Sequence, residues 1–256
     1  MKITILNDNI ASGICNAAHG LSWMIEADKK ILFDTGPSDI IIKNAETLGM
    51  SLTDVFQIVL SHGHWDHANG LQYLNGGKLL AHPEIYRKRF NRSHGIGIDI
   101  SQEQIEKKYE VTYSKDPLKI SNEIYFLGEI ERVHDWDSGH EDFKLENGED
   151  DSVPDDTGIV AHTNQGLVVI SGCAHSGITN ITEQARRLFP DKPVISVMGG
   201  FHLKPGDKRI QPTIEYFKSL NLKSLYPSHC TAPEVIAEMR ESLPVKFVRS
   251  GNIFRF

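Results

Sequence analysis

The chain has 256 residues, of which 39% are hydrophobic and 24% charged, and its formal net charge is −7. This soluble globular composition has no apolar run near the roughly 18 residues of a membrane-spanning helix, and its negative charge disfavours nucleic-acid binding through phosphate contacts. The three cysteines, Cys15, Cys173 and Cys230, are too few for a disulfide framework, so we expect a cytoplasmic protein.

The first half of the chain alternates predicted strands and helices. The strands are expected at 2–6, within 22–36 on both sides of a turn at 27–30, within 51–62, at 78–82, and as hairpin strands within 117–130. The helices are expected at 38–50, 83–90 and 101–109, the last of them capped by Ser101.

The second half repeats this alternation, which favours an α/β fold. Its strands are expected as a pair within 157–175 and then at 193–203 and 224–231, and its helices at 178–189, 210–221 and 232–243. No linker-like composition separates the halves, so we predict one domain over residues 1–256.

Residues 131–156 hold eleven acidic and two basic residues, a net charge of −9 that leaves the rest of the chain slightly positive. We interpret this segment as a solvated acidic excursion from the domain. A lid over a site, carrying His134 and His140, and a disordered loop are alternative interpretations.

The segment "SHGHWDHANGL" at 61–71 follows an apolar, β-branched stretch. His62 and His64 are two residues apart, so in an extended chain their rings point to the same side. Asp66 and His67 follow where a turn or helix begins, and imidazole with carboxylate suits zinc, manganese, iron or nickel. The pattern therefore predicts a metal site, rather than a solvated polar loop.

Further candidate ligands follow three later predicted strands. They are Cys173, His175, His202, His229 and Cys230. Ligand sites in open α/β folds are built at the strand ends, so we expect these side chains to converge. For each histidine taken alone, a structural hydrogen bond is the alternative.

The segments "SHGHWDHANGL", "LFDTG" and "PSHC" resemble the metallo-β-lactamase superfamily of metal-dependent hydrolases. The segments "HGLSWMIE", "VVISGCAHSGI", "VMGGFHL" and "YPSHCT" resemble its branch with the archaeal 7,8-dihydropterin-6-methyl-4-(β-D-ribofuranosyl)aminobenzene-5′-phosphate synthase. The resemblance covers about residues 3–252 and implies a four-layer αββα sandwich with a metal site at one edge.

The resemblance also implies which residues hold the metals, most simply two Zn²⁺ ions. His62 and His64 would bind the first ion, and Asp66, His67 and His229 the second. Many relatives place a further histidine where this chain has "PDDTGIV".

We expect His175 to replace that histidine, with Asp155 or Asp156 as alternatives. Cys173 is either a ligand or a small buried thiol. Asp34 is expected to accept a hydrogen bond from a ligand histidine, or else only to form a turn.

Two further groups are candidate substrate contacts. His202 follows two glycines and is expected to contact substrate or donate a proton, or else to be structural. Arg87 and Arg89, in the basic cluster "YRKRFNR", are expected to bind a phosphate or carboxylate of the substrate, or else to lie on a solvated helix face.

The sequence thus predicts hydrolysis of a small anionic ester, amide or phosphoester by a metal-bound hydroxide, which Asp66 would orient. One alternative is a dihydropterin-transferring synthase that releases diphosphate, and the substrate would then be phosphate-bearing and pterin-like. A second alternative is a redox or non-catalytic metal-binding protein. A nuclease is disfavoured by the acidic charge.

Overall fold

The computed structural model describes residues 1–138 and 142–256, and its strands form three sheets. The chain is divided into two compact units, and each sheet belongs to one of them. Unit 1 comprises Met1–Lys115, Glu141–Asp155 and Arg249–Phe256, and unit 2 comprises Asp116–His140 and Asp156–Val248. The expectation of one domain over 1–256 stays a prediction, and His140 lies outside the described residues.

Unit 1 contains a seven-stranded sheet in the order β16-β1-β2-β3-β4-β5-β8. The strands β16, β1, β2 and β3 pair antiparallel, whereas β3, β4, β5 and β8 are parallel. Their bounds are β1 Lys2–Asn7, β2 Ser22–Glu26, β3 Lys30–Phe33, β4 Gln57–Val59, β5 Gly77–Ala81, β8 Tyr109–Tyr113 and β16 Ile253–Arg255.

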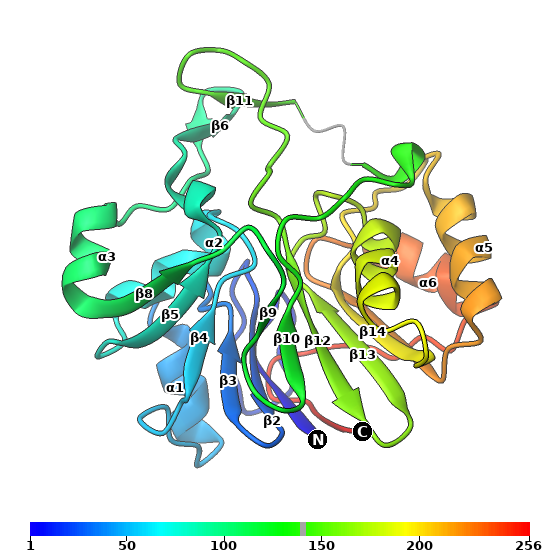
Figure 1. The fold of residues 1–256 in the computed structure, drawn as a ribbon, viewed down its shortest axis with the longest axis horizontal. Helices are drawn as coiled ribbons and strands as arrows, with labels where there is room; N and C mark the ends of the chain where they lie inside the picture. Colours follow the sequence, from blue (N-terminus) through cyan, green and yellow to red (C-terminus); the bar gives the residue numbers. More distant parts are fainter. Residues whose placement is uncertain (139–141) are drawn as a thin grey trace. The chain divides into compact units, whose positions relative to one another are not determined.

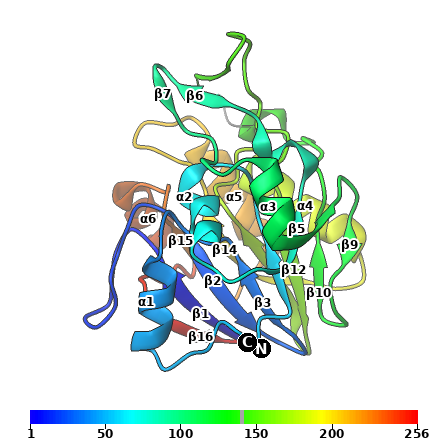
Figure 2. The same ribbon diagram turned by 90° about the vertical axis from the view of Figure 1, so that its left-hand side faces the viewer.

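Short helices cover this sheet, and Figure 2 shows α1, α2 and α3 in front of it. They are α1 Ile40–Thr47, α2 Trp65–Ala68 and α3 Gln102–Lys108, with 3-10 turns η1 Asn69–Gln72 and η2 Pro83–Tyr86. Ser101 caps α3 through a capping box with Gln104, as the sequence predicts. A small sheet of β6 Arg89–Asn91, β7 His94–Gly95 and β11 Phe143–Leu145 completes unit 1.

Unit 2 contains a six-stranded sheet in the order β15-β14-β13-β12-β10-β9, and β13, β14 and β15 are parallel. Its strands are β9 Leu118–Lys119, β10 Ile124–Phe126, β12 Gly158–Thr163, β13 Gly166–Ser171, β14 Val194–Gly200 and β15 Ser224–Ser228. Its helices are η3 Asp135–Asp137, α4 Ile178–Leu188, α5 Ile210–Leu220 and α6 Pro233–Arg240. Figure 1 shows α4, α5 and α6 on one side of β13 and β14.

Each unit has its own hydrophobic core. Leu32, Ile58 and Leu79 belong to the core of unit 1, and Val169, Val197 and Phe217 to that of unit 2. Every residue of β13 and β14 is buried, and most of them are apolar. This is common for parallel strands, which are covered on both faces. None of the helices in the described part of the chain is long and apolar enough to cross a membrane.

The structure corrects two sequence predictions. The predicted helix over 83–90 ends after the single turn η2, and Arg89 begins strand β6. The acidic segment 131–156 is not uniformly solvated, because Asp137, Asp155 and Asp156 are fully buried.

Candidate metal centre

Two imidazole nitrogens of unit 1 face one another just beyond strand β4. His62 Nε2 lies 3.0 Å from His64 Nδ1, and both rings are buried. Two ligand nitrogens on one tetrahedral zinc ion stand about 3.3 Å apart, given zinc–nitrogen bonds of about 2.05 Å. The separation in the structure is therefore close to what a shared cation requires.

Gly63 allows this turn because its backbone lies against the 3-10 turn η2. A Cβ atom at this position would stand 1.9 Å from the carbonyl oxygen of Ile85. His64 follows in an extended conformation as the N-cap of α2. The chain therefore leaves the buried strand with both histidines directed to one point.

Asp34 fixes the orientation of His67. Its Oδ2 accepts a hydrogen bond from His67 Nδ1 at 2.6 Å and from Ser61 Oγ at 2.7 Å. With Nδ1 used in this way, Nε2 carries the lone pair, and it lies 3.8 Å from Asp66 Oδ2. A carboxylate that fixes the tautomer and orientation of the ring in this way is the usual support of a metal-ligating histidine.

The protonation state of His64 also suits a ligand. Burial, and after it the positive charge of Arg89, lower the pKa of His64 to about 3. The imidazole is therefore neutral at physiological pH, as a metal requires of its ligands. The donors of unit 1 thus fit a divalent first-row metal.

His19 is a neighbour of this group that the sequence analysis did not single out. Its Nε2 lies 3.3 Å from Asp66 Oδ2, and its side chain is 59% exposed. The ring also packs 5.9 Å from that of Trp65. The quoted segment "HGLSWMIE" begins with this histidine, but a lone histidine between alanine and glycine gave no chemical signal.

In unit 2 the predicted residues follow the ends of β13, β14 and β15, which are parallel and therefore end at one edge of the sheet. The rings of His175 and His202 stand 4.6 Å apart. Three residues at these ends have left-handed backbone conformations, Ala174 at φ 52°, His202 at φ 50° and His229 at φ 50°. Such strain in non-glycine residues is typical of functional sites.

Cys230, one of the candidate ligands that the sequence offers after the predicted strands, joins this group. Burial raises the pKa of its thiol, but the hydrogen bond with Cys173 and the charges of His202 and His229 outweigh burial and lower the pKa well below its usual value. Its Sγ lies 3.7 Å from the Cys173 carbonyl oxygen. Gly200 makes room for the thiol, since a Cβ there would meet Sγ at 2.4 Å.

Asp155 and Asp156 each hold the backbone beside a predicted ligand. Asp155 Oδ2 accepts the Gly63 N–H at 2.8 Å, within unit 1. Asp156 Oδ2 accepts the Ser176 N–H at 2.8 Å, within unit 2, next to His175. Both oxygens of Asp155 are also bound by Arg89.

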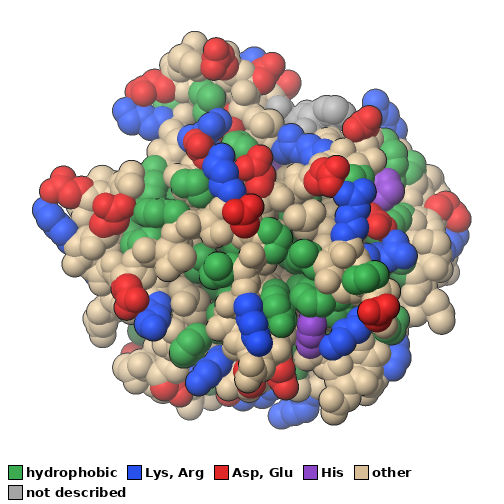
Figure 3. Space-filling view, in the orientation of Figure 1, with side chains coloured by type: hydrophobic (Ala, Val, Ile, Leu, Met, Phe, Trp, Pro, Cys, Tyr) green, Lys and Arg blue, Asp and Glu red, His purple; other side chains and the backbone are tan. Residues whose placement is uncertain are grey.

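The expected basic cluster does not form an anion site at Arg89. Its side chain is fully buried and paired with Asp151 and Asp155, so it is not available to a substrate. Arg87 is partly exposed and paired with Glu84 at 2.5 Å. The exposed face drawn in Figure 3 likewise mixes lysine and arginine with aspartate and glutamate.

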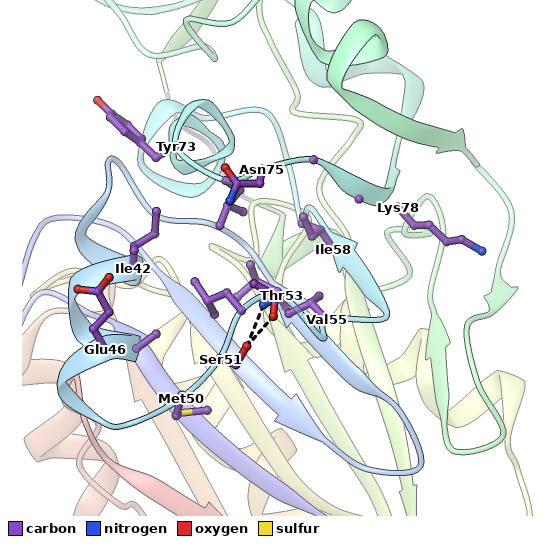
Figure 4. A pocket seen from close by; sticks show the side chains of 16 residues that line it. Ile42, Glu46, Met50, Ser51, Thr53, Val55, Ile58, Tyr73, Asn75 and Lys78 are labelled. Carbon is purple, nitrogen blue, oxygen red and sulfur yellow. Dashed lines mark hydrogen bonds between the residues drawn. The ribbon is translucent and has the colours of Figure 1, made fainter.

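A separate cavity of about 500 Å³ in unit 1 contains none of these residues. Its walls come from α1, the loop at 50–55 and the first residues of β5, with Ile42, Val55 and Ile58 among its apolar side chains (Figure 4). Glu46 is its one carboxylate. This cavity therefore does not bear on the predicted metal chemistry.

The structure thus assembles two groups of candidate ligands, one in each unit. Unit 1 brings together His62, His64, Asp66 and His67 around Asp34, and unit 2 brings together Cys173, His175, His202 and Cys230 beside His229. That these half-sites share two metal ions stays a prediction.

The chain is similar in sequence to one protein family and to two archaeal proteins. Residues 16–190 match the family model described as the metallo-β-lactamase superfamily. The chain is 33% identical over 264 residues to the 7,8-dihydropterin-6-methyl-4-(β-D-ribofuranosyl)-aminobenzene-5′-phosphate synthase of Methanocaldococcus jannaschii, covering 93% of this chain and 90% of that one. It is 34% identical over 250 residues to the uncharacterized protein MJ0448 of the same organism, covering 93% and 94%.

A solved structure shares the fold over the full length. The crystal structure of Tm1679, described as a metal-dependent hydrolase of the β-lactamase superfamily, is 29% identical, with a TM-score of 0.91 and coverage of 100% of this chain and 99% of that one. The predicted α/β fold of this type is thereby confirmed.

Proposed function

The chain belongs to the metallo-β-lactamase superfamily, and on that premise we propose that it is an enzyme that uses two divalent metal ions, most simply Zn²⁺, to act on a small anionic substrate. The observation that carries the proposal is the Asp34–His67 hydrogen bond at 2.6 Å, because it fixes the His67 ring with Nε2 at 3.8 Å from Asp66 Oδ2. Metal-ligating histidines generally donate their other ring N–H to a carboxylate in this way.

We assign the ligands as follows. His62, His64 and His175 would hold one ion, and Asp66, His67 and His229 the other. Asp155 is a poor alternative to His175, because both its oxygens are taken by Arg89 and Gly63. When bound, the ions would lower the pKa of a water molecule and polarise a phosphoryl or carbonyl oxygen.

The first candidate reaction is hydrolysis of a phosphoester or related anionic ester. The oxygen of water forms a bond to phosphorus, the bond to the ester oxygen breaks, and the departing oxygen takes a proton. Asp66 would orient the attacking water, and His202 would donate the proton from unit 2. The description of Tm1679 as a metal-dependent hydrolase supports this reaction.

The second candidate is transfer of a dihydropterin methyl group with release of diphosphate. The identity to the archaeal synthase over 93% of the chain favours it. A carbon–nitrogen bond to the amino group of the aromatic acceptor would then form as the carbon–oxygen bond to diphosphate breaks, and the amino nitrogen would lose a proton. In both reactions the substrate is an anion, and the metal ions rather than Arg89 would attract it.

Turnover by protein loaded with Zn²⁺ and by chelator-treated protein tests the proposal. The substrates are p-nitrophenyl phosphate, bis(p-nitrophenyl) phosphate and a dihydropterin diphosphate with and without an aminobenzene ribose phosphate. Hydrolysis needs no acceptor, whereas transfer yields its product only when the acceptor is present.

The double variant His64→Ala with His67→Ala should lose both zinc and turnover. The exposed His94 supplies the control, since His94→Ala removes an imidazole of unit 1 from strand β7. Activity that persists in the zinc-free double variant would refute the proposal.

A further inference from the structure

We propose that Arg89 is a positioning residue of the half-site in unit 1. Its guanidinium holds the Asp155 carboxylate, and that carboxylate holds the backbone N–H between His62 and His64. The inference rests on the proposed function, because it concerns how the chain presents these two histidines to a metal ion.

The contact between Arg89 and Asp155 is bidentate. Nη1 donates to Asp155 Oδ2 at 2.9 Å, and Nη2 donates to Oδ1. The same Oδ2 accepts the Gly63 N–H at 2.8 Å. A planar fork fixes both the position and the rotation of a carboxylate, which a single charge on a flexible stem does not.

Burial of this ion pair carries a desolvation cost, so stability alone does not explain its presence. Arg89 is 1% exposed, and Asp151, whose Oδ2 lies 2.7 Å from Arg89 Nε, has a fully buried side chain. Buried ion pairs of this kind are often replaced by apolar residues without loss of stability.

The backbone at Gly63 is tightly packed on one side. Gly63 already lies against Ile85, where a Cβ would clash at 1.9 Å. On the C-terminal side of His64, the Trp65 N–H donates to Ile96 O at 3.1 Å, and the Ile96 N–H donates to Arg89 O at 2.9 Å. The residue that holds Asp155 thus also anchors the hairpin that supports the start of α2.

Asp151 supplies a matched control within the same network. Both Asp151 and Asp155 are buried partners of Arg89, but only Asp155 contacts Gly63. Asp155→Ala and Asp151→Ala therefore remove the same charge from the same guanidinium, and only the first removes the acceptor of the Gly63 N–H. The Gly63 contact thus distinguishes the two variants in their effect on the ligands, while thermal unfolding reports any general loss of stability.

The experiment measures zinc affinity by competition with a chromophoric chelator, together with hydrogen exchange of the Gly63 amide and thermal unfolding in the zinc-free protein. We expect Asp155→Ala to lower zinc affinity by about 10–100-fold and to accelerate Gly63 exchange, and Asp151→Ala to leave both near wild type. Arg89→Lys keeps the charge without the fork and should lower zinc affinity as well. Arg87→Met, in the same cluster, should not.

Equal zinc affinities for Asp155→Ala and Asp151→Ala, or an unaltered affinity for Arg89→Lys, would overturn the inference. If the alanine variants do not fold, wild type still decides it, because unprotected exchange of the Gly63 amide in the zinc-free protein would contradict the proposed contact. None of these readouts needs a substrate. Absence of turnover would therefore count against the proposed function alone.

Discussion

Asp34 illustrates how much of the predicted chemistry depends on single contacts. It follows strand β3 in a left-handed conformation with φ 57°, an arrangement that places its carboxylate between Ser61 and His67. Because "LFDTG" resembles a family motif, Asp34 was expected to accept a hydrogen bond from a ligand histidine. From the residues alone, a plain turn at Asp34 was an equal alternative, because its partner His67 lies more than thirty positions away.

Asp34→Asn should weaken zinc binding by about 10–100-fold, because an amide no longer favours the His67 tautomer with its proton on Nδ1 and its lone pair on Nε2. Zinc titration of the purified variant checks this result. Asp39→Asn, at the N-cap of α1 with a side chain that is 40% exposed, is the control and should bind zinc like wild type. An unchanged affinity for Asp34→Asn would show that His67 does not depend on this carboxylate.

His19 makes a prediction about catalysis rather than metal binding. Its Nε2 contacts Asp66 and its side chain is exposed, so it can exchange protons between the site and solvent. His19→Gln should keep its zinc and lose about 100-fold in kcat, within the usual range for a general acid or base. His94→Gln is the matched control, and a His19→Gln variant with normal kcat would assign His19 a structural role.

At the scale of elements, the acidic segment is attached to helix α4 of unit 2. Asp137 Oδ2 accepts hydrogen bonds from Thr179 N and Thr179 Oγ1, both at 2.7 Å. The His134 N–H donates to Asn180 Oδ1 at 2.7 Å. A negative charge at this position also complements the N-terminal end of the helix dipole.

The burial of Asp137 should make stability depend on pH. Burial raises the pKa of Asp137 to about 6, although the Thr179 hydrogen bonds and the charge of Arg209 oppose the shift. Because the folded pKa exceeds the unfolded value of about 3.9, the contribution is full below about pH 4 and is lost as pH rises through 6. The loss amounts to about 3 kcal/mol.

Asp137→Asn should flatten this dependence, since the amide oxygen still accepts from Thr179 and carries no charge. Urea unfolding at pH 4, 6 and 8 measures the slope. Asp135→Asn, in the same 3-10 turn, is the control and should retain the slope of wild type. Identical slopes for Asp137→Asn and wild type would contradict the assignment.

Elements whose pattern is local were predictable from the sequence, and the others were not. The alternating strands β1 to β3 and the apolar runs of β13 and β14 agree with the sequence predictions. Strand β6 was predicted as helix because Pro83 begins a helical turn, whereas Arg89 pairs with Leu145, far along the chain. The buried triad of Arg89, Asp151 and Asp155 was missed for the same reason: charged residues read as exposed until their partners are known.

At the scale of the whole molecule, the candidate ligands are divided between two units that the chain visits in turn. If the half-sites share their metals, ligands from different units should be energetically coupled. His67→Ala and His229→Ala should then be strongly non-additive in their effect on zinc affinity, and the first alone should remove most of the binding at that ion.

Isothermal titration of the two single variants and the double variant measures this coupling. A cycle with His67→Ala and His162→Ala, a histidine on strand β12 that stacks on Tyr125, is the control and should be additive. Additive effects for His67 and His229 would mean that each unit binds zinc by itself, and the assignment of His229 to the second ion would then be wrong.

One peptide bond has an unusual consequence for engineering this chain. Asp155 is the last residue of the middle segment of unit 1, and its carboxylate accepts the Gly63 N–H. Asp156 is the first residue of the second segment of unit 2, and its carboxylate accepts the Ser176 N–H. A single glycine inserted between them would lengthen, by about 3.5 Å, the link between two carboxylates that each hold a backbone amide of a different unit. Loop grafts and circular permutants should therefore leave this dipeptide intact and place their new ends elsewhere.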